Sequence, residues 1–193
     1  DKCVALFRHQ NLDEWQESNF AARFGQLGKV LHKHNGASQV PGVMYISNIR
    51  ENGALIGSLP DGEMFFHSDQ CYTPNPAIAT MLYAMEIPSA GGNTLFANCF
   101  KAYDTLPDEV KRRIDGRLAM NVYDYQANAT KRGSEIKEGI PHFAHPVVQT
   151  HPANGRKSLY VNRLMTDHIV GMDADESNEL LEYLFDHSEQ QHL

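Results

Sequence analysis

Two residues with complementary chemistry, His67 and Asp69, are separated by a single serine in the segment Phe65-Phe66-His67-Ser68-Asp69. In an extended strand, residues i and i+2 project from the same face, so an imidazole nitrogen and a carboxylate oxygen could face one ion. A histidine and a carboxylate, completed by a second histidine, form the facial triad of non-haem iron(II) oxygenases. The alternative interpretation is a histidine hydrogen-bonded to a nearby aspartate at the end of a strand.

A second segment, from Pro88 to Phe96, joins a glycine turn to a threonine. The paired glycines, Gly91 and Gly92, allow a tight path of the backbone. Thr94 follows them and is predicted to open a strand, with its hydroxyl free to donate a hydrogen bond. Taken alone, the segment indicates a turn in which Thr94 acts as a cap.

Three residues near the His-x-Asp segment, Glu63, Phe65 and Tyr72, could line a substrate pocket. Packing in the core is an equally good explanation for the two aromatic side chains. Farther along the chain, His145 and His151 each precede a proline, which biases their backbone toward an extended conformation. We expect structural hydrogen bonds at both histidines.

Composition limits the class of protein. The chain has 193 residues, of which 41% are hydrophobic and 21% charged, and its net charge is −7. These values are typical of a globular protein of one large domain or two small ones, and they exclude a disordered chain or a coiled coil. A basic footprint for nucleic acid is absent, and no apolar run approaches the ~20 residues that span a bilayer. We therefore expect neither nucleic acid nor a membrane as a partner.

The three cysteines, Cys3, Cys71 and Cys99, are an odd number without a short repeat spacing. This pattern argues against a disulfide framework and against a zinc site built from cysteines. We expect reduced thiols and a cytoplasmic location.

Helices are predicted over the ranges 15–24, 107–116 and 173–187. Asp13 and Asp173 are the expected N-caps of the first and last, each with a glutamine or glutamate three residues later. An apolar stripe along the last helix indicates a buried face. The aromatic residues of the first helix are also expected in the core.

Short strands are predicted over the ranges 3–7, 43–49, 77–86, 95–97, 118–123, 147–150 and 158–162. Turn formers between the last two strands indicate a hairpin, and Glu51-Asn52-Gly53 predicts another turn. The many short strands, with helices toward both ends, favour a β-rich barrel or sandwich decorated by helices. No glycine-rich phosphate loop supports nucleotide binding.

The order of these motifs resembles that of the taurine/2,4-dichlorophenoxyacetate dioxygenase family of iron(II)- and 2-oxoglutarate-dependent enzymes. Phe66-His67-Ser68-Asp69 resembles the metal motif of the family, in which a tryptophan is common where Phe66 stands. The other similar segments follow in order along nearly the whole chain: 6–10 with 20–25, 87–98 with 102–107, 145–162, and 176–187.

The resemblance implies a β-rich α+β fold with a double-stranded β-helix, or jelly-roll, core and flanking helices. It implies a single domain over residues 1–193, truncated at both ends and lacking its closing C-terminal strands. His67 and Asp69 would bind iron, and Thr94 would hydrogen-bond a carboxylate of 2-oxoglutarate. The distal histidine ligand and the 2-oxoglutarate-binding arginine of the family would lie beyond Leu193.

The activity implied by the resemblance is hydroxylation of a small, anionic organic substrate, of sulfonate or aryloxyalkanoate type, with release of succinate and CO2. The implied partners are that substrate, 2-oxoglutarate and O2, and a homo-oligomer is expected. Two other functions stay open. One is a non-catalytic jelly-roll binding protein without a complete iron site, and the other is a metal-dependent hydrolase that uses His67 and Asp69.

Overall fold

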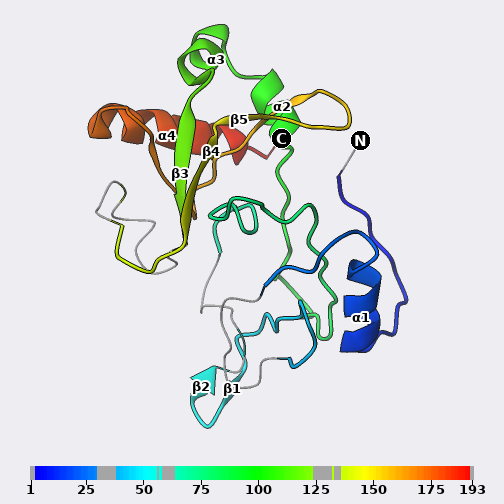
Figure 1. Ribbon diagram of the computed structural model, residues 1–193. Helices are drawn as coiled ribbons and strands as arrows, with labels where there is room; N and C mark the ends of the chain where they lie inside the picture. The colour runs from blue at the N-terminus through cyan, green and yellow to red at the C-terminus, as the bar shows by residue number, and fades with distance from the viewer. Residues whose placement is uncertain are drawn as a thin grey trace. The chain divides into compact units, whose positions relative to one another are not determined.

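The computed structural model describes residues 3–29, 38–55, 57, 64–123, 132 and 136–191. These residues contain four helices and seven strands, which are numbered in chain order (Figure 1). The chain divides into two compact units, Asp1–Met64 with Ala79–Ser89 and Phe65–Ile78 with Ala90–Leu193. They are named the first and the second unit by their order in the chain.

The first unit contains helix α1, Glu14–Ala21, which begins at the predicted N-cap. A carboxylate oxygen of Asp13 accepts a hydrogen bond from the Gln16 amide at 2.8 Å. In return, the Gln16 side-chain oxygen accepts a hydrogen bond from the Asp13 amide at 2.9 Å. These bonds form the predicted capping box and satisfy backbone N–H groups that the helix leaves without partners.

The aromatic residues at α1 are more exposed than the sequence predicts. Trp15 keeps 58% of its surface exposed, and Phe20 and Phe24 are also exposed. The ring of Phe20 meets those of Phe7 and Phe24 edge to face, with centroids 6.3 and 5.3 Å apart. The buried residue of this helix is Ser18, whose hydroxyl donates a hydrogen bond to a backbone carbonyl at 2.7 Å. The expectation of an aromatic core at α1 is therefore wrong for the described residues.

A short hairpin of the first unit pairs β1, Arg50–Glu51, with β2, Ala54–Leu55. Its turn residues, Asn52 and Gly53, both have positive φ, at +51° and +81°. That combination is typical of the type I′ turn, which matches the twist of paired strands and favours Asn-Gly. The turn predicted at this position is confirmed.

Four predicted strands do not form among the described residues: 3–7, 43–49, 77–86 and 95–97. Several of their apolar side chains are exposed, as at Leu6, Leu82 and Phe96. A strand, unlike a helix, satisfies its backbone groups only through a partner strand. An apolar run therefore becomes a strand only where a partner strand is also present.

The second unit contains most of the regular structure. Its helices are α2, Cys99–Asp104, α3, Asp108–Ile114, and α4, Ala174–Ser188. Its strands are β3, Leu118–Val122, β4, His142–Pro146, β5, Val148–Thr150, β6, Lys157–Leu159, and β7, Thr166–Ile169. Strands β4, β3 and β7 form an antiparallel sheet in that order, and β5 pairs with β6. The last two predicted helices, the strand at 118–123 and the later hairpin are confirmed.

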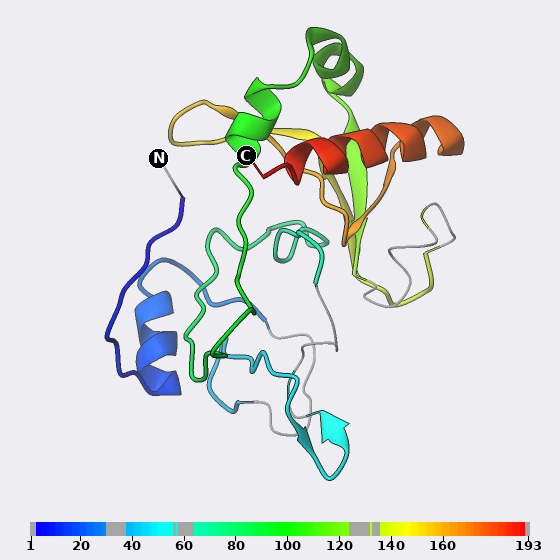
Figure 2. The same cartoon turned by 180° about the vertical axis from the view of Figure 1, so that it is seen from behind.

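The core of the second unit packs one face of α4 against the strands, and α4 runs across the three-stranded sheet in both views (Figures 1 and 2). Asp173 caps this helix, because its carboxylate accepts a hydrogen bond from the Asp175 amide at 3.0 Å. The predicted apolar stripe is buried, and its members are Leu180, Leu181, Leu184 and Phe185. Burying one such side chain stabilises a fold by about 1.5–3 kcal/mol, so this cluster is a main source of stability.

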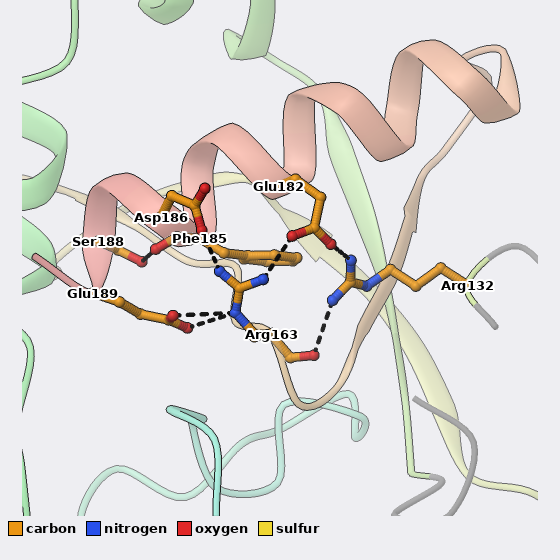
Figure 3. Close-up of polar contacts among 7 residues, drawn as sticks. All are labelled: Arg132, Arg163, Glu182, Phe185, Asp186, Ser188 and Glu189. Carbon is orange, nitrogen blue, oxygen red and sulfur yellow. Dashed lines mark hydrogen bonds and ion pairs between the residues drawn. The ribbon is translucent and has the colours of Figure 1, made fainter. Parts of the chain in front are cut away.

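A cluster of ion pairs joins the segment before β7 to the C-terminal half of α4 (Figure 3). The guanidinium of Arg163 pairs with three acidic side chains at 2.6–3.1 Å: Glu182, Asp186 and Glu189. Arg132 also pairs with Glu182, and both guanidinium groups lie over the ring of Phe185. Burial raises the pKa of Glu182, but hydrogen bonds from the two arginines outweigh it and lower that pKa from its ordinary value of 4.5.

The antiparallel sheets and the four helices confirm the predicted β-rich α+β class. Within the described residues, the strands form three small sheets of two, three and two strands. None of the helices described is both long enough and apolar enough to cross a bilayer.

Candidate metal site

His67 and Asp69 lie side by side in the second unit. Exposure alternates along residues 64–70, with Phe65, His67 and Asp69 more exposed than the residues between them. This alternation is typical of extended backbone, in which residues i and i+2 share a face. The imidazole Nε2 of His67 lies 3.3 Å from the carboxylate Oδ1 of Asp69. The structure thus brings together the two residues predicted to bind a metal.

The ring of His67 is oriented by the backbone two residues earlier. Its Nδ1 lies 2.9 Å from the carbonyl oxygen of Phe65, which can only accept a hydrogen bond, so Nδ1 carries a proton. In a neutral imidazole, Nε2 then presents a lone pair toward the Asp69 carboxylate. A lone pair and an anionic oxygen at this separation repel each other unless a cation binds both.

A proton or a metal ion can meet that requirement. The hydrogen bond to Asp69 raises the pKa of His67, and burial opposes the rise. A divalent metal replaces the proton on binding, because a ligand histidine must be neutral and a ligand carboxylate ionised. A backbone carbonyl that holds Nδ1–H is also a common way to orient a histidine ligand. The donor atoms of His67 and Asp69 therefore fit a divalent metal ion.

The pair supplies one nitrogen and one oxygen ligand. In the part of the chain that the structure describes, no group of three or more His, Cys, Asp or Glu residues is placed to hold a metal. Cys71 follows Asp69 closely, but burial raises the pKa of its thiol to about 11, so the thiol is neutral at neutral pH. None of the three cysteines forms a disulfide, as the sequence predicts.

The backbone turns sharply after Asp69. Gln70 has a φ of +56°, in the left-handed region that is uncommon for residues other than glycine. The amide and the hydroxyl of Thr73 both donate hydrogen bonds to the Gln70 carbonyl, at 2.9 and 2.8 Å. The side chains of Cys71 and Tyr72 are buried. Residues 70–73 thus form a compact turn behind Asp69, that is, directly after it in the chain. This turn ends the extended stretch.

Thr94 lies in an exposed stretch of the second unit, after the predicted glycine turn. Gly91 and Gly92 have φ values of +74° and +67°, which glycine adopts without steric penalty. The two values agree with the tight backbone path predicted for the paired glycines, and Thr94 beyond them is exposed. The co-substrate role of its hydroxyl stays a prediction.

The three residues predicted to line a substrate pocket have different surroundings. Phe65, two residues before His67, keeps 45% of its surface exposed. Tyr72 is only 7% exposed, and its ring centroid lies 4.5 Å from that of Tyr123. Glu63 lies outside the described residues.

The two histidines that precede prolines make the predicted structural hydrogen bonds. Nε2 of His145 donates to the carbonyl oxygen of Thr73 at 2.8 Å. Nδ1 of His151 accepts a hydrogen bond from the Ala153 amide at 3.2 Å. The bond made by His145 reaches the turn behind Asp69.

Sequence reasoning missed a chain of buried polar side chains behind that turn. Asn121, Asn162 and Thr166 are all buried, and the hydroxyl of Thr166 donates to Oδ1 of Asn121 at 2.8 Å. Asn162 also contacts Cys71, with Nδ2 lying 3.6 Å from Sγ. These partners lie 45 and 91 residues apart along the chain, so no local pattern marks them.

Comparison with known proteins identifies the family. Residues 2–193 match the family described as taurine catabolism dioxygenase TauD, TfdA family. The chain belongs to this family. The match confirms the resemblance inferred from the order of the motifs. Alpha-ketoglutarate-dependent dioxygenases of this family use Fe(II) and 2-oxoglutarate, which is alpha-ketoglutarate under its systematic name.

Two relatives are similar over nearly the whole chain. The alpha-ketoglutarate-dependent dioxygenase cnsM of Penicillium expansum is 33% identical, over 97% of this chain and 55% of its own length. The alpha-ketoglutarate-dependent 2,4-dichlorophenoxyacetate dioxygenase of Burkholderia sp. strain RASC is 29% identical, over 98% of this chain and 67% of its own length. The chain thus spans a little over half of the first relative and about two thirds of the second.

Two solved structures have a similar fold. A taurine dioxygenase from Burkholderia xenovorans matches with a TM-score of 0.70 and 28% identity, over 95% of this chain and 58% of its own. AAD-2, solved in complex with Mn(II) and N-oxalylglycine, matches with a TM-score of 0.67 and 25% identity, over 96% of this chain and 64% of its own.

Proposed function

We propose that this chain carries the metal-binding part of an Fe(II)- and 2-oxoglutarate-dependent dioxygenase. The observation that carries the proposal is the His67–Asp69 pair, in which an imidazole nitrogen and a carboxylate oxygen lie 3.3 Å apart in a chain of this family. A histidine and a carboxylate are two of the three ligands of the facial triad in non-haem iron oxygenases. The reaction would convert a substrate C–H bond, 2-oxoglutarate and O2 into an alcohol, succinate and CO2.

In this proposal, His67 Nε2 and the Asp69 carboxylate hold Fe(II). Bound iron supplies the centre at which O2 is activated while 2-oxoglutarate is oxidised. The Phe65 carbonyl holds Nδ1–H of His67, which keeps Nε2 as the ligand atom and fixes the plane of the ring. The left-handed backbone of Gln70 ends the extended stretch directly after Asp69.

Thr94 is assigned the binding of one carboxylate of 2-oxoglutarate. Its hydroxyl can donate a hydrogen bond to a carboxylate oxygen, and its exposed position after Gly91 and Gly92 leaves it accessible to a ligand. The AAD-2 structure, which holds Mn(II) together with the dicarboxylate N-oxalylglycine, supports a paired metal and dicarboxylate site.

The substrate is proposed to be a small organic anion, a sulfonate or an aryloxyalkanoate. Similar proteins are named for taurine, which is a sulfonate, and for 2,4-dichlorophenoxyacetate, which is an aryloxyalkanoate. Phe65 offers an exposed aromatic surface two residues from His67. Tyr72 and Glu63 complete the set of residues assigned to the substrate.

Residues 1–193 are proposed to belong to a single dioxygenase domain with a jelly-roll core. The likeness in fold to the taurine dioxygenase, over 95% of this chain, supports this assignment. A homo-oligomeric assembly is proposed from the family resemblance alone.

Turnover measurements test the proposed function. With Fe(II) and O2, the protein is expected to form succinate in step with hydroxylation of one member of a panel of sulfonates and aryloxyalkanoates. Thr94→Val should raise the KM for 2-oxoglutarate about tenfold or more, because a hydrogen bond to a charged group contributes about 1.5–3 kcal/mol. Thr94→Ser keeps the hydroxyl and should stay within about threefold of the wild type.

The other two functions have distinct outcomes in the same experiment. Metal binding without succinate formation for every compound in the panel would favour a binding protein. Hydrolysis of a compound without consumption of O2 would favour a metal-dependent hydrolase.

A further inference from the structure

The turn behind Asp69 is held by buried side chains from other parts of the second unit. Gln70, with its left-handed backbone, connects the carboxylate-bearing residue to the buried residues Cys71 and Tyr72. The proposed metal site needs the Asp69 carboxylate to stay beside Nε2 of His67. A contact that fixes residues 71–73 limits the movement of the backbone next to Asp69, from which the carboxylate extends.

His145 provides the first of these contacts. It lies on β4 opposite Ala119 of β3, and its side chain is buried. Its Nε2 donates a hydrogen bond to the Thr73 carbonyl at 2.8 Å. The ring also contacts those of Phe143 and Tyr160, with centroids 4.9 and 5.6 Å away. The sheet thus holds a rigid donor against the end of the turn.

Asn162 provides the second contact, from the segment between β6 and β7. Its Nδ2 donates to Sγ of Cys71 at 3.6 Å, while its Oδ1 accepts from the Met165 amide at 2.9 Å. The thiol of Cys71 also lies 3.5 Å from the sulfur of Met165. The backbone N–H of Asn162 donates a hydrogen bond to the hydroxyl of Thr166 at 2.9 Å. That hydroxyl donates in turn to the side-chain oxygen of Asn121 on β3. A continuous series of buried polar contacts therefore links β3 to Cys71.

Ion pairs hold the segment that carries Asn162 against the C-terminal part of α4. Arg163, the next residue, is paired with Glu182, Asp186 and Glu189 (Figure 3). Asn162 therefore acts from an anchored position rather than from a mobile one.

We propose that His145 and Asn162 are positioning residues of the metal site, which hold residues 71–73 so that Asp69 stays directed at His67. The inference rests on the proposed function, because it concerns the same site. Both residues act through intermediate groups, the Thr73 carbonyl and the Cys71 thiol, which lie four and two residues after Asp69.

Binding of Mn(II) alone to the whole protein, followed by electron paramagnetic resonance, tests the role of His145. His145→Ala is expected to weaken Mn(II) binding by about threefold to tenfold, which is less than the about 10–100-fold typical of a group bonded directly to a ligand, because His145 acts through Thr73. His145→Gln keeps an N–H donor at a similar reach and should bind Mn(II) within about threefold of the wild type.

Ser177→Ala is the matched control. Ser177 of α4 is also buried, and its hydroxyl accepts a hydrogen bond from the Ile169 amide at 2.8 Å. The variant loses a buried hydrogen bond in the same unit, so its thermal midpoint should fall, as for His145→Ala. Its Mn(II) affinity should stay within about twofold of the wild type, because its bond does not reach the turn.

The role of Asn162 is tested through its partner. Cys71→Ala removes the acceptor of Asn162 and should weaken Mn(II) binding by about threefold to tenfold. Cys71→Ser restores an acceptor at the same position and should recover most of that loss.

The outcomes separate this inference from the proposed function. If the wild type binds no Mn(II), the proposed metal site itself fails. If the wild type binds Mn(II) but His145→Ala and Cys71→Ala bind it as tightly as Ser177→Ala does, only the positioning role is overturned. The same conclusion follows if His145→Gln and Cys71→Ser bind as weakly as the two alanine variants.

Discussion

Helix α4 and the segment 78–96 are both rich in apolar residues, yet their side chains have opposite surroundings. Leu184 and Phe185 of α4 are fully buried, whereas Ile78 and Ile87 keep 83% and 78% of their surfaces exposed. The helix satisfies its own backbone hydrogen bonds and presents its apolar stripe as soon as it forms. The segment 78–96 forms no strand within the described chain. Apolar composition therefore indicates which segments could form a core. Whether such a segment is buried depends on the helices and strands that can pack against it.

Truncation of one apolar side chain in each region gives the largest expected contrast. Phe185→Ala is expected to lower the free energy of unfolding by about 3–5 kcal/mol, because it opens a cavity in the core. Ile78→Ala is expected to change it by less than about 0.5 kcal/mol, because the side chain is exposed. Urea unfolding followed by circular dichroism measures both values. Equal losses of stability would mean that the segment 78–96 is covered in solution, contrary to the exposure of Ile78 in the structure.

Removal of a helix cap is expected to have a smaller effect on stability, which again differs between the two regions. Asp173→Ala is expected to lower the free energy of unfolding by about 1 kcal/mol, because it removes the N-cap of α4, a helix whose buried face forms part of the core. Asp13→Ala removes the same kind of cap from α1, whose large residues are exposed, and should have less than half that effect on global unfolding. The asparagine variants at both positions keep a capping oxygen and serve as controls. A larger loss of stability at Asp13 than at Asp173 would mean that the fold depends more on α1 than on α4, contrary to this prediction.

Acid titration gives the smallest expected effect. The pKa of Glu182 is lowered in the folded chain, so its ion pairs with Arg132 and Arg163 stabilise the fold above the ordinary value of 4.5. That stabilisation is lost as the pH falls through the lowered folded pKa. The difference in unfolding free energy between the wild type and Glu182→Gln should therefore be constant near neutral pH and shrink below about pH 4.5. Glu179→Gln, at an exposed position of α4, is the matched control, and an equal pH dependence in that variant would contradict the assignment.

The sequence predicted features that depend on neighbouring residues. The caps at Asp13 and Asp173, the turn at Asn52 and the apolar stripe of α4 follow from spacings of a few residues, and the structure confirms them. The proximity of His67 and Asp69 follows equally from the period of extended backbone.

Features that depend on tertiary contacts were not predictable in this way. Arg163 finds its acidic partners 19 to 26 residues later, and His145 reaches Thr73 across 72 residues. Trp15 and the segment 77–86 have the apolar character of a core but are largely exposed. The local sequence limits the conformations and contacts available to a residue. Long-range packing then determines which of these contacts form.

His67 and Asp69 are the proposed metal ligands, and His142 provides a close internal control for them. His142 repeats the local geometry of His67, because its Nδ1 lies 2.8 Å from the carbonyl of Ile140, two residues earlier. It lies at an exposed position of β4. A variant at His142 therefore removes an equivalent imidazole outside the proposed site.

The most direct measurement is the visible absorption spectrum of the anaerobic protein with Fe(II) and 2-oxoglutarate. Chelation of iron by 2-oxoglutarate is expected to give a weak metal-to-ligand charge-transfer band in the wild type and in His142→Ala. The band should be absent in His67→Ala, which lacks one of the two ligands. A wild type without the band, or an unchanged band in His67→Ala, would contradict the assignment of the site.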